Sequence, residues 1–133
     1  MFKKLNENAR LPAYQTEYSG AVDLYILEDR VLEPGTKHLL PTGVSWEPPS
    51  NVVGLIRDRS SLAWKSGLMV TAGVIDVDYR DEIRVVLWNM SDETCVFYKH
   101  DRIAQMLILK YEHMPGIDVI KRTREGGFGT TGS

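Results

Sequence analysis

Residues 73–80 read Gly-Val-Ile-Asp-Val-Asp-Tyr-Arg, and they are the most informative stretch of the chain. Two carboxylates, Asp76 and Asp78, stand two positions apart between apolar segments. Residues two apart in a β-strand point to the same face, so we expect both acids to project together and Tyr79 to point the other way. Burying an unpaired charge among apolar neighbours is costly, so acids in such a setting usually have a chemical task. Most lone Asp-x-Asp pairs, however, are solvated turn residues.

The bulk composition is that of one globular domain. The chain has 133 residues, of which 43% are hydrophobic and 26% charged, and its formal net charge is −2. This balance argues against a nucleic-acid-binding protein, which normally carries a basic surplus. The single cysteine, Cys95, excludes an internal disulfide and fits a reducing compartment.

No segment of the chain has the pattern of an export signal or a membrane span. Residues 1–8 contain no apolar run of signal-peptide length, and no stretch approaches the ~20 apolar residues of a membrane helix. We therefore expect a protein of the cytoplasm, or of the host-cell cytoplasm if the source is viral, that binds neither membranes nor nucleic acid.

Short apolar runs recur along the chain, and turn-forming residues separate them. Many short runs without a long helical period predict an all-β sandwich or barrel. The expected strands are Val22–Ile26, Lys37–Leu40, Val52–Ile56, Ile83–Trp88, Thr94–Tyr98, Ile103–Tyr111 and Ile117–Ile120.

Two segments depart from this strand pattern. Residues 60–67 predict a two-turn helix, with Asp58 or Ser60 as N-cap and Gly67 as its C-terminal stop. Four glycines fall within the last eight residues and cannot build a core, so we expect a flexible tail. The predicted organisation is a β domain over 1–121 and a glycine-rich lid over 122–133.

Several polar groups have the chemistry of a phosphate site. Arg59, Ser60 and Ser61 open the predicted helix, where free N–H groups, a guanidinium and two hydroxyls can hold an anion. Asp23 can reach a Mg²⁺ ion through water, since this ion keeps most of its water shell. Gln105 adds a donor near the start of a strand. Each feature alone also fits an ordinary cap or turn.

The tail has a related composition. Arginines, threonine hydroxyls and glycine amides can wrap phosphates, and Phe128 can stack on a base. The tail lacks the lysine and the spacing of a P-loop, which excludes that motif. A disordered terminus is the commoner fate of such a sequence.

In their order along the chain, these segments resemble the five motifs of the trimeric dUTPases (deoxyuridine triphosphate nucleotidohydrolases). The matching segments are Ser-Gly-Ala-Val-Asp-Leu (19–24), Arg-Ser-Ser-Leu-Ala (59–63), Gly-Val-Ile-Asp-Val-Asp-Tyr-Arg (73–80), Asp-Arg-Ile-Ala-Gln (101–105) and Gly-Gly-Phe-Gly-Thr-Thr-Gly (126–132). The resemblance implies an all-β, distorted jelly-roll-like barrel or sandwich with one short helix. It also implies a homotrimer in which three subunits contribute motifs to each active site.

The activity implied by the resemblance is hydrolysis of dUTP to dUMP and diphosphate with Mg²⁺, which keeps uracil out of DNA and supplies dUMP for dTMP synthesis. Asp76 would activate the water that attacks the α-phosphorus, a role that suits an aspartate ionised at neutral pH. Asp78 would give structural support, Tyr79 would pack beneath the deoxyribose, and Asp23 would reach Mg²⁺ through water. The other implied substrate-binding residues are Arg59, Ser60, Ser61 and Gln105 for the phosphates, Gly73, Val74, Ile75 and Arg84 for uracil, and Arg124, Phe128, Thr130 and Thr131 in the closing tail.

The sequence departs from the family pattern at three places. Asp81 and His100 stand where glycine is usual. In the tail, Thr123 occupies the place of the usual arginine, so Arg122 and Arg124 are both candidates for the γ-phosphate contact, and we favour Arg124.

Three alternatives to a dUTP hydrolase fit the sequence less well. A dCTP deaminase of the same fold would carry an arginine and a catalytic glutamate at positions that are Trp64 and Val86 here, so no group is placed for deamination. A catalytically idle nucleotide sensor is disfavoured by the intact set of Asp76, Tyr79 and Phe128. A structural β protein would require all five motifs to be accidental.

Overall fold

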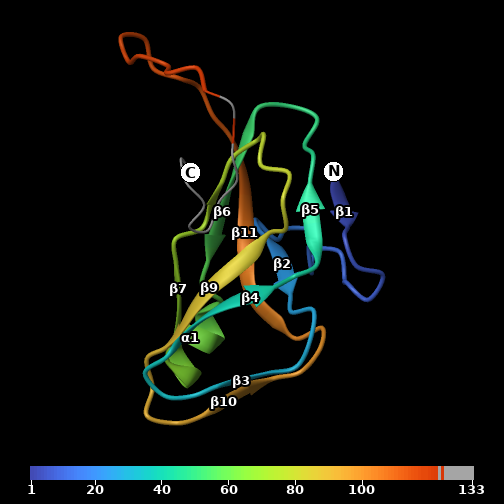
Figure 1. The fold of residues 1–133 in the computed structure, drawn as a ribbon, viewed down its shortest axis with the longest axis vertical. Coiled ribbons are helices and arrows are strands. Elements are labelled where there is room, and N and C mark those ends of the chain that lie inside the picture. The colour runs from blue at the N-terminus through green and yellow to red at the C-terminus, as the bar shows by residue number, and fades with distance from the viewer. Residues whose placement is uncertain (123, 125–133) are drawn as a thin grey trace.

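The computed structural model describes residues 1–122 and 124. Within them the chain forms β-strands and one short helix (Figure 1), which confirms the predicted all-β class. In chain order the elements are β1 (Phe2–Lys4), β2 (Val22–Tyr25), β3 (Arg30–Leu32), β4 (Lys37–Pro41), β5 (Val44–Trp46), β6 (Val52–Arg57), α1 (Ser60–Ser66), β7 (Leu68–Thr71), β8 (Val74–Ile75), β9 (Arg84–Asn89), β10 (Cys95–Phe97) and β11 (Arg102–Lys110).

Antiparallel pairing arranges the described strands in separate sheets. The largest has the order β2-β11-β6-β8, and a second has the order β4-β9-β7. Two small ribbons pair β1 with β5 and β3 with β10. Figure 1 shows β11 in the middle of the molecule, between β6 and β2. The described residues therefore form open sheets and not the closed barrel that the sequence left as one alternative.

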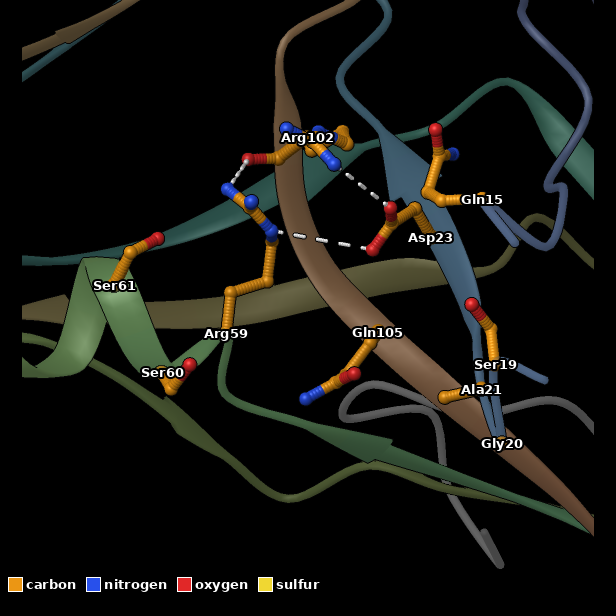
Figure 2. Close-up of a pocket in the computed structure, with 10 residues that line it drawn as sticks. All are labelled: Gln15, Ser19, Gly20, Ala21, Asp23, Arg59, Ser60, Ser61, Arg102 and Gln105. Atoms are coloured by element: carbon orange, nitrogen blue, oxygen red, sulfur yellow. Dashed lines mark hydrogen bonds and ion pairs between the residues drawn. The ribbon is translucent and has the colours of Figure 1, made fainter.

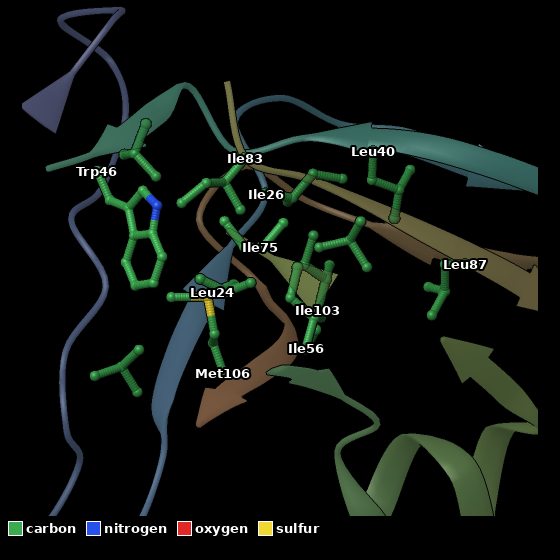
Figure 3. Packing of buried hydrophobic residues seen from close by; sticks show 14 of the residues in the cluster. Leu24, Ile26, Leu40, Trp46, Ile56, Ile75, Ile83, Leu87, Ile103 and Met106 are labelled. Atoms are coloured by element: carbon green, nitrogen blue, oxygen red, sulfur yellow. The ribbon is translucent and has the colours of Figure 1, made fainter. Parts of the chain in front are cut away.

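Alternating burial explains why several strands could be predicted. In β6 and in β9, buried residues alternate with partly buried or exposed ones. Such alternation turns one face of a strand toward the core. The buried cluster in Figure 3 includes Leu24, Ile26, Leu40, Trp46, Ile56, Ile75, Ile83, Leu87, Ile103 and Met106.

The helix α1 begins and ends close to the predicted positions. Gly67 adopts a φ of 64° and its N–H bonds to the Leu62 carbonyl, which confirms it as the C-terminal stop. The expected caps are wrong, because Arg59 is the N-cap residue and makes no side-chain cap bond. Asp58 instead accepts the Val70 N–H at 2.7 Å, and so satisfies a donor of the edge strand β7. Among the described residues, no helix has the length and apolarity needed to cross a bilayer.

Two predicted strands differ from the structure. Asp76 and Asp78 lie in a turn and not on a strand face, because the Tyr79 N–H bonds back to the Asp76 carbonyl at 3.1 Å. The expected strand at Ile117–Ile120 does not form, since no described segment pairs with it and its apolar side chains are exposed. An extended segment needs a partner ladder to become a strand, and the sequence pattern alone supplies none.

Candidate active site

One pocket gathers polar side chains from distant parts of the sequence (Figure 2). Four predicted phosphate-binding residues and the predicted magnesium residue all line it. The lining residues are Gln15, Ser19, Gly20, Ala21, Asp23, Arg59, Ser60, Ser61, Arg102 and Gln105.

Strand register brings these residues together. Gln105 on β11 is the backbone partner of Asp23 on β2 and of Arg57 on β6. Arg59 follows β6 by two residues, and the Gln105 side chain donates to the Asp58 carbonyl at 2.8 Å. The two ladders of β11 therefore hold the start of α1 beside Asp23.

The charge balance of the pocket is positive. Asp23 is only 8% exposed, and its carboxylate lies 3.9 Å from Arg59 Nε and 3.4 Å from Arg102 Nη1. Arg59 also donates to the Arg102 carbonyl at 3.5 Å. Two guanidinium groups around one carboxylate leave a net positive charge, and the hydroxyls of Ser60 and Ser61 add donors. Such a pocket suits an anion with several oxygens.

A resident metal ion fits these residues poorly. No group of three or more histidine, cysteine or acidic side chains with metal-binding potential occurs in residues 1–122 and 124. Asp23 is the acid that lines the pocket, and a bare cation there would meet two guanidinium groups. A hydrated cation carried by a polyphosphate is compatible with the site, because its ligands come mainly from the anion and from water.

The connection between β7 and β8 has an unusual backbone. The expected hairpin is not formed here, because β7 pairs with β9 and β8 pairs with β6. Ala72 and Gly73 have φ values of 61° and 115°, in the region that favours glycine. A Cβ on Gly73 would also lie 2.9 Å from the Ile56 carbonyl oxygen. The Ile56 N–H bonds to the Gly73 carbonyl at 2.8 Å, which fixes this connection against β6. Gly73, Val74 and Ile75 thus present a fixed backbone at this edge of the sheet.

The turn after β8 carries Asp76 and Asp78, and Arg124 binds both aspartates. Arg124 Nε donates to Asp78 at 2.7 Å, and Arg124 Nη2 bonds to Asp76. Burial lowers the pKa of Arg124, but the hydrogen bonds to Asp76 and Asp78 outweigh it, and the pKa lies above its ordinary value. Both carboxylates are more than half exposed, so they remain accessible to a ligand that displaces the arginine.

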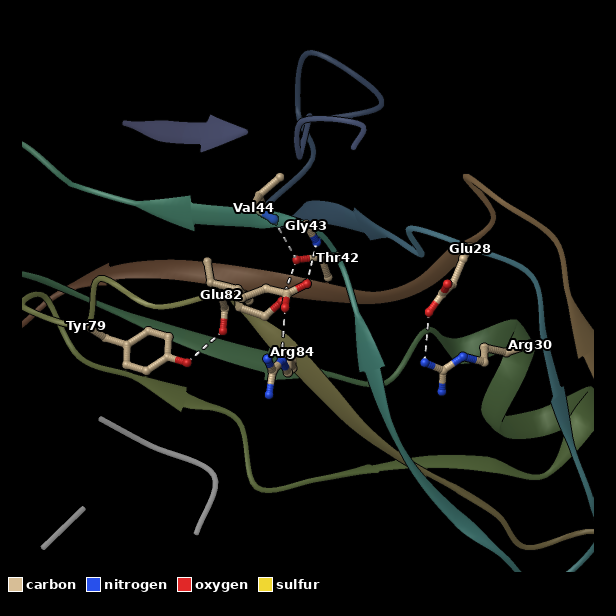
Figure 4. A network of polar contacts seen from close by, with 9 residues as sticks. Glu28, Arg30, Thr42, Gly43, Val44, Tyr79, Glu82 and Arg84 are labelled. Carbon is tan, nitrogen blue, oxygen red and sulfur yellow. Dashed lines mark hydrogen bonds and ion pairs between the residues drawn. The ribbon is translucent and has the colours of Figure 1, made fainter. Parts of the chain in front are cut away.

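Tyr79 is the buried member of the same turn. Its ring is 5% exposed, and its hydroxyl donates to the Glu82 carbonyl at 2.6 Å. The Glu82 carboxylate accepts bonds from the Gly43 N–H at 2.8 Å and from Arg84 Nε at 3.0 Å (Figure 4). Burial, followed by the charge of Asp81, raises the pKa of Tyr79, so the phenol stays protonated and keeps donating. The Tyr79 ring is therefore held in one orientation.

The phosphate pocket and the aspartate turn are separate within one chain. Asp23 on β2 and Ile75 on β8 lie at opposite edges of the four-stranded sheet, so three strand spacings, or about 14 Å, separate them. The structure therefore brings together Asp23, Arg59, Ser60, Ser61 and Gln105, and separately Asp76, Tyr79 and Arg124. The predicted residues Phe128, Thr130 and Thr131 lie outside the described residues.

The structure shows the surroundings of two residues that depart from the family pattern, and of one pocket residue that the sequence did not predict. His100 adopts a φ of 70° at a position that favours glycine, and its ring bonds to the Asn8 carbonyl at 2.6 Å. Asp81 lies next to the buried Tyr79 and contributes to its raised pKa. Arg102 lines the pocket but was not among the predicted site residues, although it lies within the motif that contains Gln105.

Comparison with known proteins identifies the family. A family model described as dUTPase matches residues 7–132. The chain belongs to the dUTPase family.

Curated relatives match the chain over nearly its whole length. The deoxyuridine 5'-triphosphate nucleotidohydrolase of Nautilia profundicola is 43% identical, with 98% of this chain and 96% of the relative covered. That of Cytophaga hutchinsonii is also 43% identical, with 94% and 86% covered. The dUTPase from phage phi11 of S. aureus has a similar fold, with a TM-score of 0.80 at 23% identity over 92% of this chain and 96% of the phage chain.

Replacing Arg59 by alanine should weaken the binding of tripolyphosphate to the pocket. A hydrogen bond to a charged group is worth about 1.5–3 kcal/mol, so the dissociation constant should rise about tenfold or more. Isothermal titration calorimetry measures this change. Arg30→Ala is the control, because Arg30 pairs with Glu28 at 2.9 Å and does not line the pocket. Equal affinity of the Arg59 variant and the unaltered protein would contradict the assignment.

Proposed function

We propose that this protein is a dUTP diphosphatase, which hydrolyses dUTP to dUMP and diphosphate. The observation that carries the proposal is the pocket in which Arg59 and Arg102 flank the single carboxylate of Asp23, because its positive balance suits a polyphosphate. The substrate follows from the family and from relatives such as the N. profundicola enzyme, whose name specifies deoxyuridine 5'-triphosphate.

In the proposed mechanism, Asp76 acts as the general base. Its carboxylate takes a proton from water as the water oxygen bonds to the α-phosphorus. The bond from this phosphorus to the oxygen that bridges the α- and β-phosphates then breaks, and diphosphate leaves with the electron pair. The protein contributes mainly alignment and charge stabilisation, which phosphoryl transfer chiefly requires.

Arg124 links substrate binding to the freeing of this base. Its guanidinium pairs with Asp76 and Asp78. While the guanidinium occupies this carboxylate, the carboxylate cannot hold the attacking water, so Asp76 acts once the guanidinium has moved to the phosphates. Because Arg124 already lies beside the base, this supports Arg124 over Arg122 as the contact to the γ-phosphate.

We assign selectivity for deoxyuridine to residues 73–75 and to Tyr79. Main-chain groups of Gly73, Val74 and Ile75, together with the region of Arg84, would read the uracil edge. The ring of Tyr79, held by its hydroxyl bond to the Glu82 carbonyl, would pack beneath the deoxyribose and leave no room for a 2′-hydroxyl. Phe128 would stack on the base, and Thr130 and Thr131 would close over the triphosphate.

We further propose a jelly-roll-like homotrimer with active sites shared between subunits. The separation of about 14 Å between β2 and β8 supports this, because one chain cannot place Asp76 beside its own phosphate pocket. Residues 1–121 would form the β domain, and residues 122–133 the lid that completes each site. We place the enzyme in the cytoplasm, where it would keep uracil out of DNA and supply dUMP.

Magnesium would enter the site with the substrate. Asp23 would hold the hydrated ion through water, and the ion would neutralise charge on the triphosphate. The related phage phi11 dUTPase coordinates a structural Mg(II) ion, which is a different role. The proposal for this chain therefore rests on the donor chemistry of Asp23.

The direct test is the release of diphosphate from dUTP by the purified protein. Rapid release from dUTP is expected. Release from UTP should be much slower because Tyr79 would exclude the 2′-hydroxyl, and release from dTTP and dCTP should be slower because residues 73–75 would read the uracil edge. A coupled phosphate assay measures the release. Equal rates with UTP would remove Tyr79 from its role, and absence of release from dUTP would refute the proposed function.

Asp76→Asn should keep dUTP binding and lower turnover by about 10²-fold or more, the order that general-base assistance supplies. Rapid-quench kinetics gives turnover, and calorimetry with a non-hydrolysable analogue gives binding. Asp78→Asn is the matched control, since Asp78 lies in the same turn and also binds Arg124. Near-normal turnover of the Asp76 variant, or an equal loss in the Asp78 variant, would contradict the assignment.

Truncation after Lys121 should leave a folded trimer with little activity, because the proposed lid lies outside the β domain. Light scattering reports the oligomeric state, circular dichroism reports folding, and the diphosphate assay reports activity. Dissociation of the trimer on truncation would instead assign these residues a structural role.

A further inference from the structure

The backbone of Asp76 is held by a side chain from another part of the core. The indole N–H of Trp46 donates to the Asp76 carbonyl at 3.0 Å, and the Tyr79 N–H donates to the same carbonyl at 3.1 Å. We propose that Trp46 is a positioning residue for catalysis, which fixes the direction of the Asp76 side chain. This inference rests on the proposed function, since it takes Asp76 to be the general base.

The Asp76 carboxylate cannot be positioned by the core directly. It is 53% exposed and pairs with the guanidinium of Arg124, which must leave before Asp76 can act. The direction of the carboxylate therefore depends on the backbone that carries it. The bond from Trp46 fixes the plane of the peptide after Asp76, and the turn bond from Tyr79 fixes the same carbonyl from the other side of the turn.

The indole is itself immobile. Trp46 is fully buried, and its ring occupies space that a side chain at Gly54 would fill. A Cβ at Gly54 would lie 3.2 Å from Trp46 Cη2 and 3.3 Å from Ile75 Cβ. Gly54 and Ile75 are partners in the β6–β8 ladder, so the ring packs on the strand pair that leads into Asp76.

The strand that carries Trp46 is also fixed along its length. β5 pairs with β1, in which Phe2 lies opposite Trp46 and stacks on it with 6.4 Å between ring centroids. The Ile83 N–H bonds to the Val44 carbonyl at 2.8 Å and ties β5 to the segment after the turn. The donor of the Asp76 bond thus belongs to rigid structure, while the acceptor belongs to a turn.

A second donor acts on the same turn without replacing this bond. Arg80 donates to the Val77 carbonyl at 2.6 Å. This contact spans three residues and shapes the turn internally. Arg80 also donates to the Trp46 carbonyl at 3.5 Å, a longer bond to the backbone that a change of the Trp46 side chain leaves in place. The bond from the Trp46 indole spans 30 residues and holds the carbonyl of Asp76 itself. Because alignment errors of about 1 Å can cost up to about 10²-fold in rate, loss of this bond should lower the rate of catalysis.

The first test replaces Trp46 by phenylalanine, which keeps a buried ring and removes the N–H donor. We expect kcat for dUTP to fall about tenfold and KM to change less than about twofold, since the bond orients the base and touches no substrate. Phe2→Leu is the control, because it removes the stacked ring and leaves the N–H bond. An unchanged kcat in Trp46→Phe, or an equal fall in Phe2→Leu, would overturn the inference.

A double-mutant cycle separates positioning from a general structural effect. If Trp46 acts through Asp76, Trp46→Phe should change the residual kcat of Asp76→Asn by less than about twofold, because the group it aligns has been removed. The same factor in both backgrounds would show that Trp46 acts elsewhere, and the inference would fail.

A third variant covers the case in which Trp46→Phe does not fold. Site-specific replacement of Trp46 by 3-benzothienylalanine keeps the shape of the indole and puts sulfur in place of N–H. A fall in kcat is expected here too, and wild-type kcat would overturn the inference. If the unaltered protein releases no diphosphate from dUTP, the proposed function itself fails, whereas an active protein with fully active variants refutes only the role of Trp46.

Discussion

Strand β11 hydrogen-bonds along both of its edges, to β2 and to β6, and this double ladder is the constraint on which the site depends. It aligns Gln105 with Asp23 on one side and with Arg57 on the other. It thereby brings the start of α1 to the carboxylate and fixes the distance between the two arginines. The same ladder keeps β8 at the far edge of the sheet, so one chain holds the positive pocket and the proposed base, Asp76, apart.

Charge distribution follows from this arrangement. In the pocket a nearly buried carboxylate lies between two guanidinium groups, whereas in the turn two exposed carboxylates share one. The pocket is therefore deficient in negative charge and the turn is deficient in positive charge. In the proposed function, the oxygens of a polyphosphate would bind the pocket and draw Arg124 away from the turn.

Much of this could be predicted from the sequence. The apolar runs of β6, β9 and β11 could be recognised because a strand with one buried face has a regular pattern of apolar residues. Gly67 could be recognised because a helix that ends in the left-handed conformation favours glycine. Asp23, Arg59 and Gln105 could be placed in one site through their motifs. Their ion pairs and hydrogen bonds could not, because these depend on strand register.

The wrong predictions have a common cause, because each depended on a partner that lies far away in the sequence. Asp58 was expected to cap α1 and binds an edge strand instead. Asp76 was expected on a strand and lies in a turn held by Trp46, which no local pattern indicates. Ile117–Ile120 has the composition of a strand and no partner within the described residues.

The contact between Gly54 and Trp46 has an evolutionary consequence. A side chain at position 54 would lie 2.9 Å from Met106 Sδ and 3.2 Å from Trp46 Cη2, so position 54 cannot enlarge alone. Homologues that place alanine or a larger residue there should carry an altered side chain at position 106 or a smaller one at position 46. In lineages where position 46 is the one that changes, a different donor would have to restrain the turn.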